Sequence, residues 1–363
     1  MEPIKVVQWA SGGIGANTLR AVIERPELEL AGLLVYSDDK VGVDAGEIAG
    51  LGVKTGILGT KDRDEIYALD ADCVIHVPML HRSMTDEHHG EVMRLLESGK
   101  NVVTALDYFF PPAVSPEYTL EVTKACENGG TTLMGIGNSP GFICERVTTT
   151  VSSHCLEIDH IEVVEKMDCS YISEIGFPIM GFGLTPEEFA GAGVGAMWDP
   201  MYKQVPAAVC HILGAPLQRI ELTSRIGVAD RELVLPNATV EPGKVCANAW
   251  KWTAFVDDRP FFSYETQWVL DREMPGWEAD NSWVITVHGK PSIRVKYERA
   301  VAYEDGVRRG GGHGEPGYDY GTSILNAAAG VILNAIPGVC AAPPGHFLAP
   351  IYGAYQYRSH TSH

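Results

Sequence analysis

The chain has 363 residues, which is longer than a typical single domain, and this length predicts two domains. Its 45% hydrophobic and 21% charged residues are typical of a globular protein and argue against a disordered or fibrous one. A net charge of -19 repels phosphate backbones and anionic lipid surfaces, so neither nucleic acid nor a membrane is expected as a partner. An anionic cofactor remains compatible with this charge, because backbone N–H groups at a helix N-terminus can hold it.

The eight cysteines are scattered without a CxxC pair, and we expect neither a metal site nor a disulfide framework from them. The first residues lack the features of a secretory leader. We find no apolar stretch that reaches the ~18–20 residues of a membrane span. The expected location is the cytoplasm.

Residues 4–9 predict a strand, residues 14–24 a helix and residues 28–35 a second strand, the order of a dinucleotide-binding βαβ unit. The turn after the first strand reads A-x-G-x-x-G, with alanine at the first glycine position. Gly12 would let the backbone approach a pyrophosphate, and Gly15 would let helix and strand pack closely. The predicted cofactor-binding loop is Ala10, Ser11, Gly12, Gly13, Ile14 and Gly15. A glycine-rich turn without a ligand is the alternative.

The end of the second strand bears on which nicotinamide cofactor binds. It reads Val35-Tyr36-Ser37 and lacks the acidic residue that grips a ribose 2′-hydroxyl. Ser37 and Lys40 suit a 2′-phosphate, whereas Asp38 or Asp39 would oppose it. This favours NADP and leaves NAD open.

The alternation of strands and helices continues to residue 140 and then changes. Further strands are predicted at 73–77, 101–104 and 131–136, with helices at 86–98 and after Ser115-Pro116-Glu117. Residues 1–140 thus predict a Rossmann domain with a doubly wound parallel sheet. Residues 141–320 predict a second α+β domain with a mostly antiparallel sheet for substrate binding and dimerisation. Its strands are expected at 158–166, 220–225, 244–256, 261–270, 282–287 and 292–297, and its helices at 185–196 and 202–213.

The C-terminal part begins with a glycine-rich segment, residues 308–317, interpreted as a linker or mobile loop. Residues 321–335 then predict an apolar helix ended by Pro337. A helix this apolar is expected to be buried, so residues 321–345 are predicted to return to the first domain.

Several segments resemble the dihydrodipicolinate-reductase-like oxidoreductases, which include 2,4-diaminopentanoate dehydrogenase and the native amine dehydrogenases. The resemblance rests on residues 7–15, 35–37 with 40–47, 99–104, 139–142 and 334–345. It implies a Rossmann domain, a second α/β domain with dimer contacts, and hydride transfer between NAD(P)H and an imine or carbonyl carbon. A homodimer acting on a small molecule is the corresponding expectation.

The resemblance also assigns a catalytic candidate. In amine dehydrogenases of this type an acidic residue, usually Glu, follows the strand that ends in Asn-Val-Val-Thr, and here that residue is Asp107. Its carboxylate could hold an ammonium or iminium, or act as a general base. Asp is one methylene shorter than Glu, so this departure leaves ammonia-dependent amination open. A helix or turn cap before Pro111 is the alternative for Asp107.

Three further residues are candidates for substrate contact. Tyr171 resembles a substrate-facing tyrosine of the family, and Asn138 and Phe142 follow a strand end where ligands sit in such folds. Core packing is the alternative for Tyr171 and Phe142, and a turn before Pro140 is the alternative for Asn138.

The remaining cofactor candidates are His76 and Pro78 near one strand end, Thr104 at the next, and Asn334 in the last segment of the resemblance. For His76 a hydrogen-bonded core histidine is the alternative. His88 and His89 are adjacent, do not share a helix face, and are interpreted as solvated helix residues.

The leading functional hypothesis is therefore an NAD(P)-dependent oxidoreductase for a small amine, imine or carbonyl compound, similar to the amine dehydrogenases. An ammonia-independent ketone or aldehyde reductase is one alternative, and a non-catalytic NAD(P)-binding sensor is another. The segment Gly137-Asn138-Ser139-Pro140-Gly141 matches an acyl-transfer elbow, but Pro140 lacks the N–H that the oxyanion hole needs.

Overall fold

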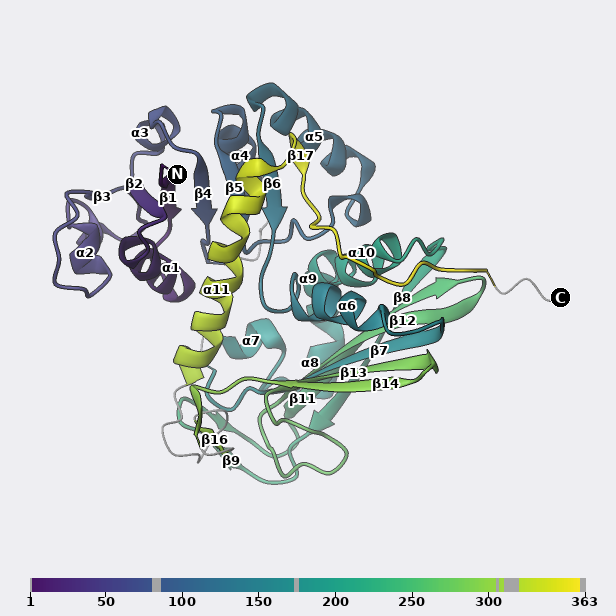
Figure 1. Ribbon diagram of the computed structural model, residues 1–363. Coiled ribbons are helices and arrows are strands. Elements are labelled where there is room, and N and C mark those ends of the chain that lie inside the picture. The colour runs from purple at the N-terminus through teal and green to yellow at the C-terminus, as the bar shows by residue number, and fades with distance from the viewer. Residues whose placement is uncertain (1, 80–85, 173–175, 305–306, 310–319, 360–363) are drawn as a thin grey trace. The chain divides into compact units, whose positions relative to one another are not determined.

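A computed structural model describes residues 2–79, 86–172, 176–304, 307–309 and 320–359 (Figure 1). The chain forms two compact units. The first comprises residues 1–142 and 324–349, and the second comprises residues 143–323 and 350–363. Each unit is described by itself.

The first unit is built on a seven-stranded sheet in which every strand pair is parallel. Its strands are β1 (Ile4–Trp9), β2 (Leu28–Leu34), β3 (Gly59–Thr60), β4 (Cys73–His76), β5 (Asn101–Thr104), β6 (Thr132–Gly135) and β17 (Gly345–His346). They lie in the order β17-β6-β5-β4-β1-β2-β3. The strand order reverses between β1 and β4, and ligands of such sheets bind beyond the carboxyl ends of the strands at this point.

Helices pack on both faces of this sheet. One face packs against α3 (Arg63–Ala68), α4 (Asp86–Glu97) and α5 (Pro116–Gly129), through a core that includes Trp9, Val74, Leu95 and Val122. The other face packs against α1 (Gly13–Glu24) and α11 (Tyr320–Ala341). The short helices are α2 (Ala45–Ile48), η1 (Asp38–Lys40) and η2 (Pro111–Ala113). The predicted Rossmann architecture is confirmed.

The start of α5 follows the predicted capping chemistry. Ser115 lies at the N-cap, and its side chain accepts a hydrogen bond of 3.1 Å from the backbone N–H of Tyr118. Pro116 occupies the first helical position, where its missing N–H is not needed. Gly130 ends the helix in the left-handed conformation, with φ +66°.

Helix α11 differs from the prediction in length. Pro337 lies inside the helix and does not end it, since α11 continues to Ala341. The segment Ser323–Ala341 is long and apolar enough to cross a membrane, with mean hydropathy 1.8, so the prediction that no stretch reaches that length was wrong. Its buried residues, among them Ile332, Ile336 and Val339, pack against the parallel sheet. Packing against the sheet therefore accounts for the apolar face of α11, and no membrane contact is needed to explain it.

The second unit contains a six-stranded sheet in the order β14-β13-β7-β12-β11-β8. Its strands are β7 (Glu157–Asp168), β8 (Arg219–Val228), β11 (Val245–Val256), β12 (Arg259–Val269), β13 (Ser282–Lys290) and β14 (Ile293–Glu298). Four of its neighbouring pairs are antiparallel, and β7 with β12 is parallel. The predicted mostly antiparallel sheet is thus confirmed. Two small hairpins add β9 (Leu233–Val234) with β10 (Thr239–Val240), and β15 (Ala302–Glu304) with β16 (Val307–Arg309).

The helices of the second unit are shorter than predicted. They are the π-helical turn η3 (Ile143–Val147), α6 (Thr148–Ser152), α7 (Gly176–Met180), α8 (Pro186–Gly191), α9 (Val194–Tyr202) and α10 (Gln204–Ile212). The single helix predicted at 185–196 is wrong, because Gly193 adopts φ +63° and separates α8 from α9. Thr185 and Glu188 form a capping box at the start of α8. Most of the predicted linker at 308–317 lies outside the described residues.

Candidate functional site

The loop between β1 and α1 has the close packing that its sequence predicted. A Cβ atom on Gly15 would lie 2.3 Å from the backbone oxygen of Ala10, so only glycine fits there. Ala10 occupies the first glycine position of the fingerprint with φ +78°, a conformation that costs an L-residue energy. The Gln8 side chain donates a hydrogen bond of 2.8 Å to the Ala10 oxygen. The Gln8 hydrogen bond thus holds the Ala10 carbonyl in place, and the missing side chain at Gly15 lets α1 pack closely against this carbonyl.

The N-terminus of α1 suits an anionic group. Gly12 is the N-cap, no side chain caps the first turn, and no acidic residue lies in it. Among the described residues, no heavy atom lies within 4 Å of a Cβ built on Gly12. Free N–H groups, the positive end of the helix dipole and an open approach are the features that hold a pyrophosphate. The residues present therefore fit a dinucleotide.

Lys40 lies beside this loop. Its ammonium donates hydrogen bonds to the backbone oxygen of Ser11, at 2.8 Å, and to the Ser11 hydroxyl, at 3.1 Å. Ser37 is exposed at the end of β2, where it precedes η1. Asp38, which the sequence set against a 2′-phosphate, forms an ion pair with Lys61. The end of β2 thus combines one cation beside the loop with one carboxylate in a surface ion pair.

Asp107 lies in the loop that follows β5, and this loop is tightly held. A Cβ on Gly135, at the end of β6, would lie 2.2 Å from the carbonyl carbon of Tyr108, so the loop crosses β6 at a glycine. The His346 ring nitrogen Nε2 lies 2.8 Å from the Tyr108 oxygen. Thr104 accepts a hydrogen bond of 3.1 Å from the Leu106 N–H. Asp107 is therefore placed by backbone packing at the carboxyl edge of the sheet.

The Asp107 carboxyl is buried, with 6% of the residue exposed. Burial raises its pKa above the usual range, and the backbone hydrogen bond and the charges of His89 and His88 oppose this only in part. The N-caps of the next two helices are Phe110 and Ser115, and the alternative of a turn cap for Asp107 stays open. A buried carboxyl with a raised pKa at a strand end has the properties of an acid–base group.

The three candidates for substrate contact lie in different settings. Asn138 donates a hydrogen bond of 3.1 Å to the backbone oxygen of Ile324, which ties the segment after β6 to α11. Phe142 is half-buried at the end of the first unit. Tyr171 belongs to the second unit, follows β7, and is 39% exposed, which does not agree with core packing.

Among the remaining cofactor candidates, His76 and Thr104 are fully buried, and His76 Nδ1 lies 3.1 Å from the Thr104 hydroxyl. This agrees with the hydrogen-bonded core histidine that was the alternative for His76. Pro78 is buried directly after β4. Asn334 accepts a hydrogen bond of 3.1 Å from Arg25, at the C-terminal end of α1. That end lies about 18 Å along the helix from the fingerprint loop.

Sequence reasoning missed a buried polar cluster beneath α4. Glu91 accepts hydrogen bonds from Arg63, at 2.7 Å, and from Tyr36, at 3.3 Å, and its Oε2 lies 2.9 Å from His88 Nδ1. The interpretation of His88 as a solvated residue was wrong, since 4% of it is exposed. Although burial alone would raise the pKa of Glu91, His76, His88 and Arg63 together hold it well below its usual range. The i, i+3 spacing of His88 and Glu91 was the available indication in the sequence.

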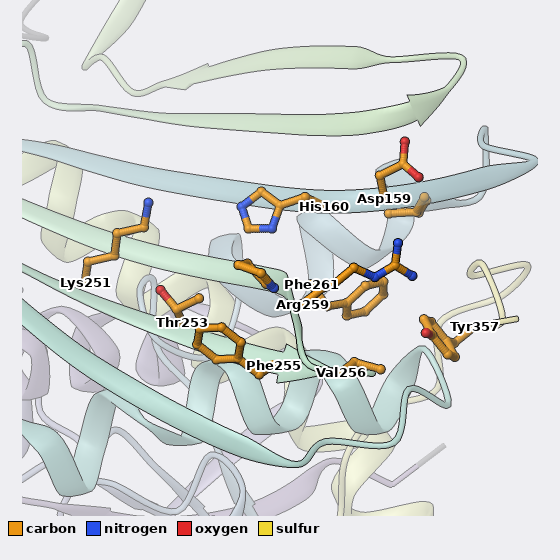
Figure 2. A pocket seen from close by; sticks show the side chains of 11 residues that line it. Asp159, His160, Lys251, Thr253, Phe255, Val256, Arg259, Phe261 and Tyr357 are labelled. Carbon is orange, nitrogen blue, oxygen red and sulfur yellow. The ribbon is translucent and has the colours of Figure 1, made fainter. Parts of the chain in front are cut away.

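The second unit has a pocket of about 690 Å³ on its sheet (Figure 2). Figure 2 shows His160, Lys251 and Thr253 on the strands, with Phe261 and Tyr357 nearby. The centroids of the Tyr357 and Phe261 rings are 5.2 Å apart, and the rings pack edge to face. None of the residues that line this pocket was predicted as a site residue.

Sequence comparison finds similarity to curated dehydrogenases. It is 30% identical to an amine dehydrogenase of Streptomyces virginiae over 169 residues, which are 46% of this chain and 47% of that protein. It is 21% identical to the 2,4-diaminopentanoate dehydrogenase of Acetoanaerobium sticklandii over 310 residues, 81% of this chain and 84% of that protein. The predicted resemblance is confirmed, although the first match spans less than half of the relative's length.

Structural comparison supports the fold over nearly the whole chain. An amine dehydrogenase structure from Mycobacterium smegmatis superposes with a TM-score of 0.74 at 20% identity, and the match covers 96% of this chain and 98% of the other. Identity at this level shows the shared fold alone. No known family profile matches the chain.

Proposed function

We propose that this protein is an NAD(P)-dependent oxidoreductase that transfers a hydride between nicotinamide and a small amine/imine or carbonyl substrate. The observation that carries the proposal is the β1–α1 loop, where Gly12 leaves an open approach and Gly15 packs against Ala10. The similarity to an amine dehydrogenase over 169 residues supports the same reading.

Asp107 is the proposed catalytic residue. NAD(P)H, when bound, supplies the hydride that reduces an imine or carbonyl carbon. Asp107 would hold the proton that accompanies the hydride, and in its ionised form would bind the ammonium or iminium nitrogen. Its buried position and raised pKa support this role, because a carboxyl of this kind exchanges protons closer to neutral pH than an exposed one. Asn138, Phe142 and Tyr171 are the proposed substrate contacts.

NADP is the proposed cofactor. The loop Ala10–Gly15 would hold the pyrophosphate, and Ser37 and Lys40 would bind the 2′-phosphate. The support is the Lys40 ammonium beside Ser11 and the pairing of Asp38 with Lys61. Lys40→Ala is expected to weaken NADP binding by about tenfold or more relative to NAD binding, the effect of losing one charged hydrogen bond, because both cofactors share the loss of the Lys40 contacts with Ser11. Equal loss for both cofactors would contradict the assignment.

One assay separates the two chemistries that remain open. NAD(P)H oxidation is measured with a panel of ketones and aldehydes, with and without ammonium. Turnover that requires ammonium supports the amine dehydrogenase activity. Turnover that is independent of ammonium supports a carbonyl reductase and excludes the amine dehydrogenase activity. Either outcome is consistent with the proposed hydride transfer.

The catalytic role of Asp107 is tested with Asp107→Asn, which keeps the size of the side chain and removes its charge. Loss of about 10²- to 10⁴-fold in turnover is expected for a general acid–base group, with NADP affinity retained. The matched control is Asp70→Asn, since Asp70 is exposed before β4 and pairs with Lys5. A protein that binds NADP tightly, turns over no substrate in the panel and ignores Asp107→Asn would instead be a sensor.

We further propose that the protein is a cytoplasmic homodimer. The implied dimer contacts belong to the second domain of the resembling family, and the sheet of the second unit carries a pocket with the aromatic residues Phe255, Phe261 and Tyr357. Light scattering after gel filtration is expected to give twice the mass of one chain. A monomer at micromolar concentration would refute the dimer.

A further inference from the structure

Three ionisable side chains converge beneath α4, in the first unit. His76 lies at the end of β4, and His88 and Glu91 lie one turn apart on α4. Each offers one ligand atom, and these atoms lie within 4.8 Å of one another. All three side chains are at least nine-tenths buried, with exposures of 0%, 5% and 6%.

The hydrogen bonds of this cluster are incomplete. His88 Nδ1 lies 2.9 Å from Glu91 Oε2, whereas His76 Nε2 lies 3.7 Å from the same oxygen, beyond hydrogen-bond distance. Among the described residues, neither the Nε2 atom of His76 nor that of His88 has a hydrogen-bond partner. Leaving a buried polar atom unsatisfied costs about 1–3 kcal/mol, so His76 Nε2, which lies 3.7 Å from the carboxylate oxygen, requires a partner.

The hydrogen bond on the far side of the His76 ring is consistent with a ligand role. Its Nδ1 lies 3.1 Å from the Thr104 hydroxyl, which also accepts the Leu106 N–H. When Nδ1 donates to this hydroxyl, the lone pair of Nε2 faces the Glu91 carboxylate. Two acceptors that face each other at 3.7 Å repel unless a cation lies between them.

We propose that His76, His88 and Glu91 bind one divalent transition-metal ion, with Zn²⁺ as the best fit. Two imidazoles and a carboxylate form a three-ligand set that Zn²⁺ uses with a fourth position open. Bonds of about 2.0–2.1 Å in tetrahedral geometry place ligand atoms about 3.4 Å apart, and the observed 2.9 and 3.7 Å lie on either side of that value.

The surroundings supply an outer shell of the kind that metal sites use. Thr104 orients His76, and Arg63 donates to Glu91 Oε1 at 2.7 Å. The other carboxylate oxygen, Oε2, is the one that lies close to both histidines and is the proposed ligand. The Tyr36 hydroxyl donates a hydrogen bond of 3.3 Å to Glu91 Oε2. An ion here would fix α4 to the end of β4, and its binding does not depend on the proposed hydride transfer.

The test uses the full chain without a histidine tag, stripped with a chelator and titrated with Co²⁺ and then Zn²⁺. One equivalent of Co²⁺ is expected to bind with the visible absorption of a four-coordinate site, and Zn²⁺ is expected to displace it. X-ray absorption of the Zn²⁺-loaded wild-type protein is expected to show two imidazole ligands and nearest neighbours about 2.0–2.1 Å away. This measurement needs no variant.

His88→Gln removes an imidazole ligand and keeps a group that can donate to Glu91. It is expected to weaken metal binding by more than about 100-fold, the upper range for loss of an outer-shell partner. The matched control is His89→Gln, because His89 contacts Tyr108 and Glu121 and lies outside the cluster. Circular dichroism confirms that each variant is folded.

Three results would overturn the proposal. The first is wild-type protein that binds less than one equivalent of Zn²⁺ or Co²⁺, the result expected if water fills the cluster. The second is an X-ray absorption spectrum without two imidazole ligands. The third is an equal loss of binding in His88→Gln and His89→Gln, which would place the metal elsewhere.

Discussion

The two glycines of the fingerprint loop have different physical roles, and paired substitutions separate them. In Gly15→Ala the new Cβ would meet the backbone oxygen of Ala10 at 2.3 Å and its carbonyl carbon at 2.9 Å. These are backbone atoms, so no side-chain rotation can relieve the contact, and α1 must move away from β1. Overpacking of this kind costs about 1–3 kcal/mol.

This cost converts into a measurable change in melting temperature. The first unit, residues 1–142 and 324–349, falls in the size range where 1 kcal/mol shifts the melting temperature by about 2–4 °C. Gly15→Ala is therefore expected to lower the transition of the first unit by about 2–12 °C. Differential scanning calorimetry of the protein without nucleotide measures this shift.

Gly12→Ala is the matched control. Among the described residues no heavy atom lies within 4 Å of a Cβ at this position, so the unliganded protein is expected to keep its stability within about 0.5 kcal/mol. Its affinity for NADP should fall instead, because the methyl group occupies the approach of the pyrophosphate. An unchanged melting temperature in Gly15→Ala, or equal losses in both variants, would refute this division of roles.

Three other substitutions test single features of the structure. Ala10→Gly relieves the φ of +78° and is expected to raise stability by up to about 1 kcal/mol, as measured by urea unfolding; a loss of stability would contradict the strain. Thr185→Ala removes the capping box with Glu188 and should cost about 0.5–2 kcal/mol in the same assay, while Thr185→Ser should cost little. Because burial raises the pKa of Asp107, its stabilising contribution is present at acid pH and is lost as the pH rises through the folded-state pKa. Asp107→Asn should therefore melt above wild type at neutral pH and not at acid pH, and a pH-independent difference would contradict the raised pKa.

The elements of the first unit could be predicted because local patterns define them. The run at Ile4–Trp9 has the β-prone composition of a buried strand, and Ser115 with Pro116 specifies the start of α5. The helix predicted at 185–196 failed for a local reason too. Gly193 adopts φ +63°, and this left-handed conformation separates α8 from α9.

The buried polar cluster could not be predicted from local patterns. His76 and Glu91 come together because α4 packs against the sheet that contains β4. The periodicity of α4 shows which residues share a face, but not which strand residue that face meets. The same limit applies to Gly135, whose need for glycine arises from its contact with Tyr108 in a loop distant in sequence.

The alanine at the first fingerprint position does not weaken the dinucleotide assignment. A ligand can approach the N-terminus of α1 only if no Cβ atom lies in its way. Gly12 is the residue at this point, and it has no Cβ. Close packing of helix and strand falls on Gly15. The first position needs a backbone conformation, φ +78°, which glycine adopts without strain and Ala10 adopts at a cost of about 1–2 kcal/mol. The hydrogen bond from Gln8 to the Ala10 oxygen offsets part of that cost. Alanine at this position therefore reduces stability and leaves the cofactor-binding surface intact.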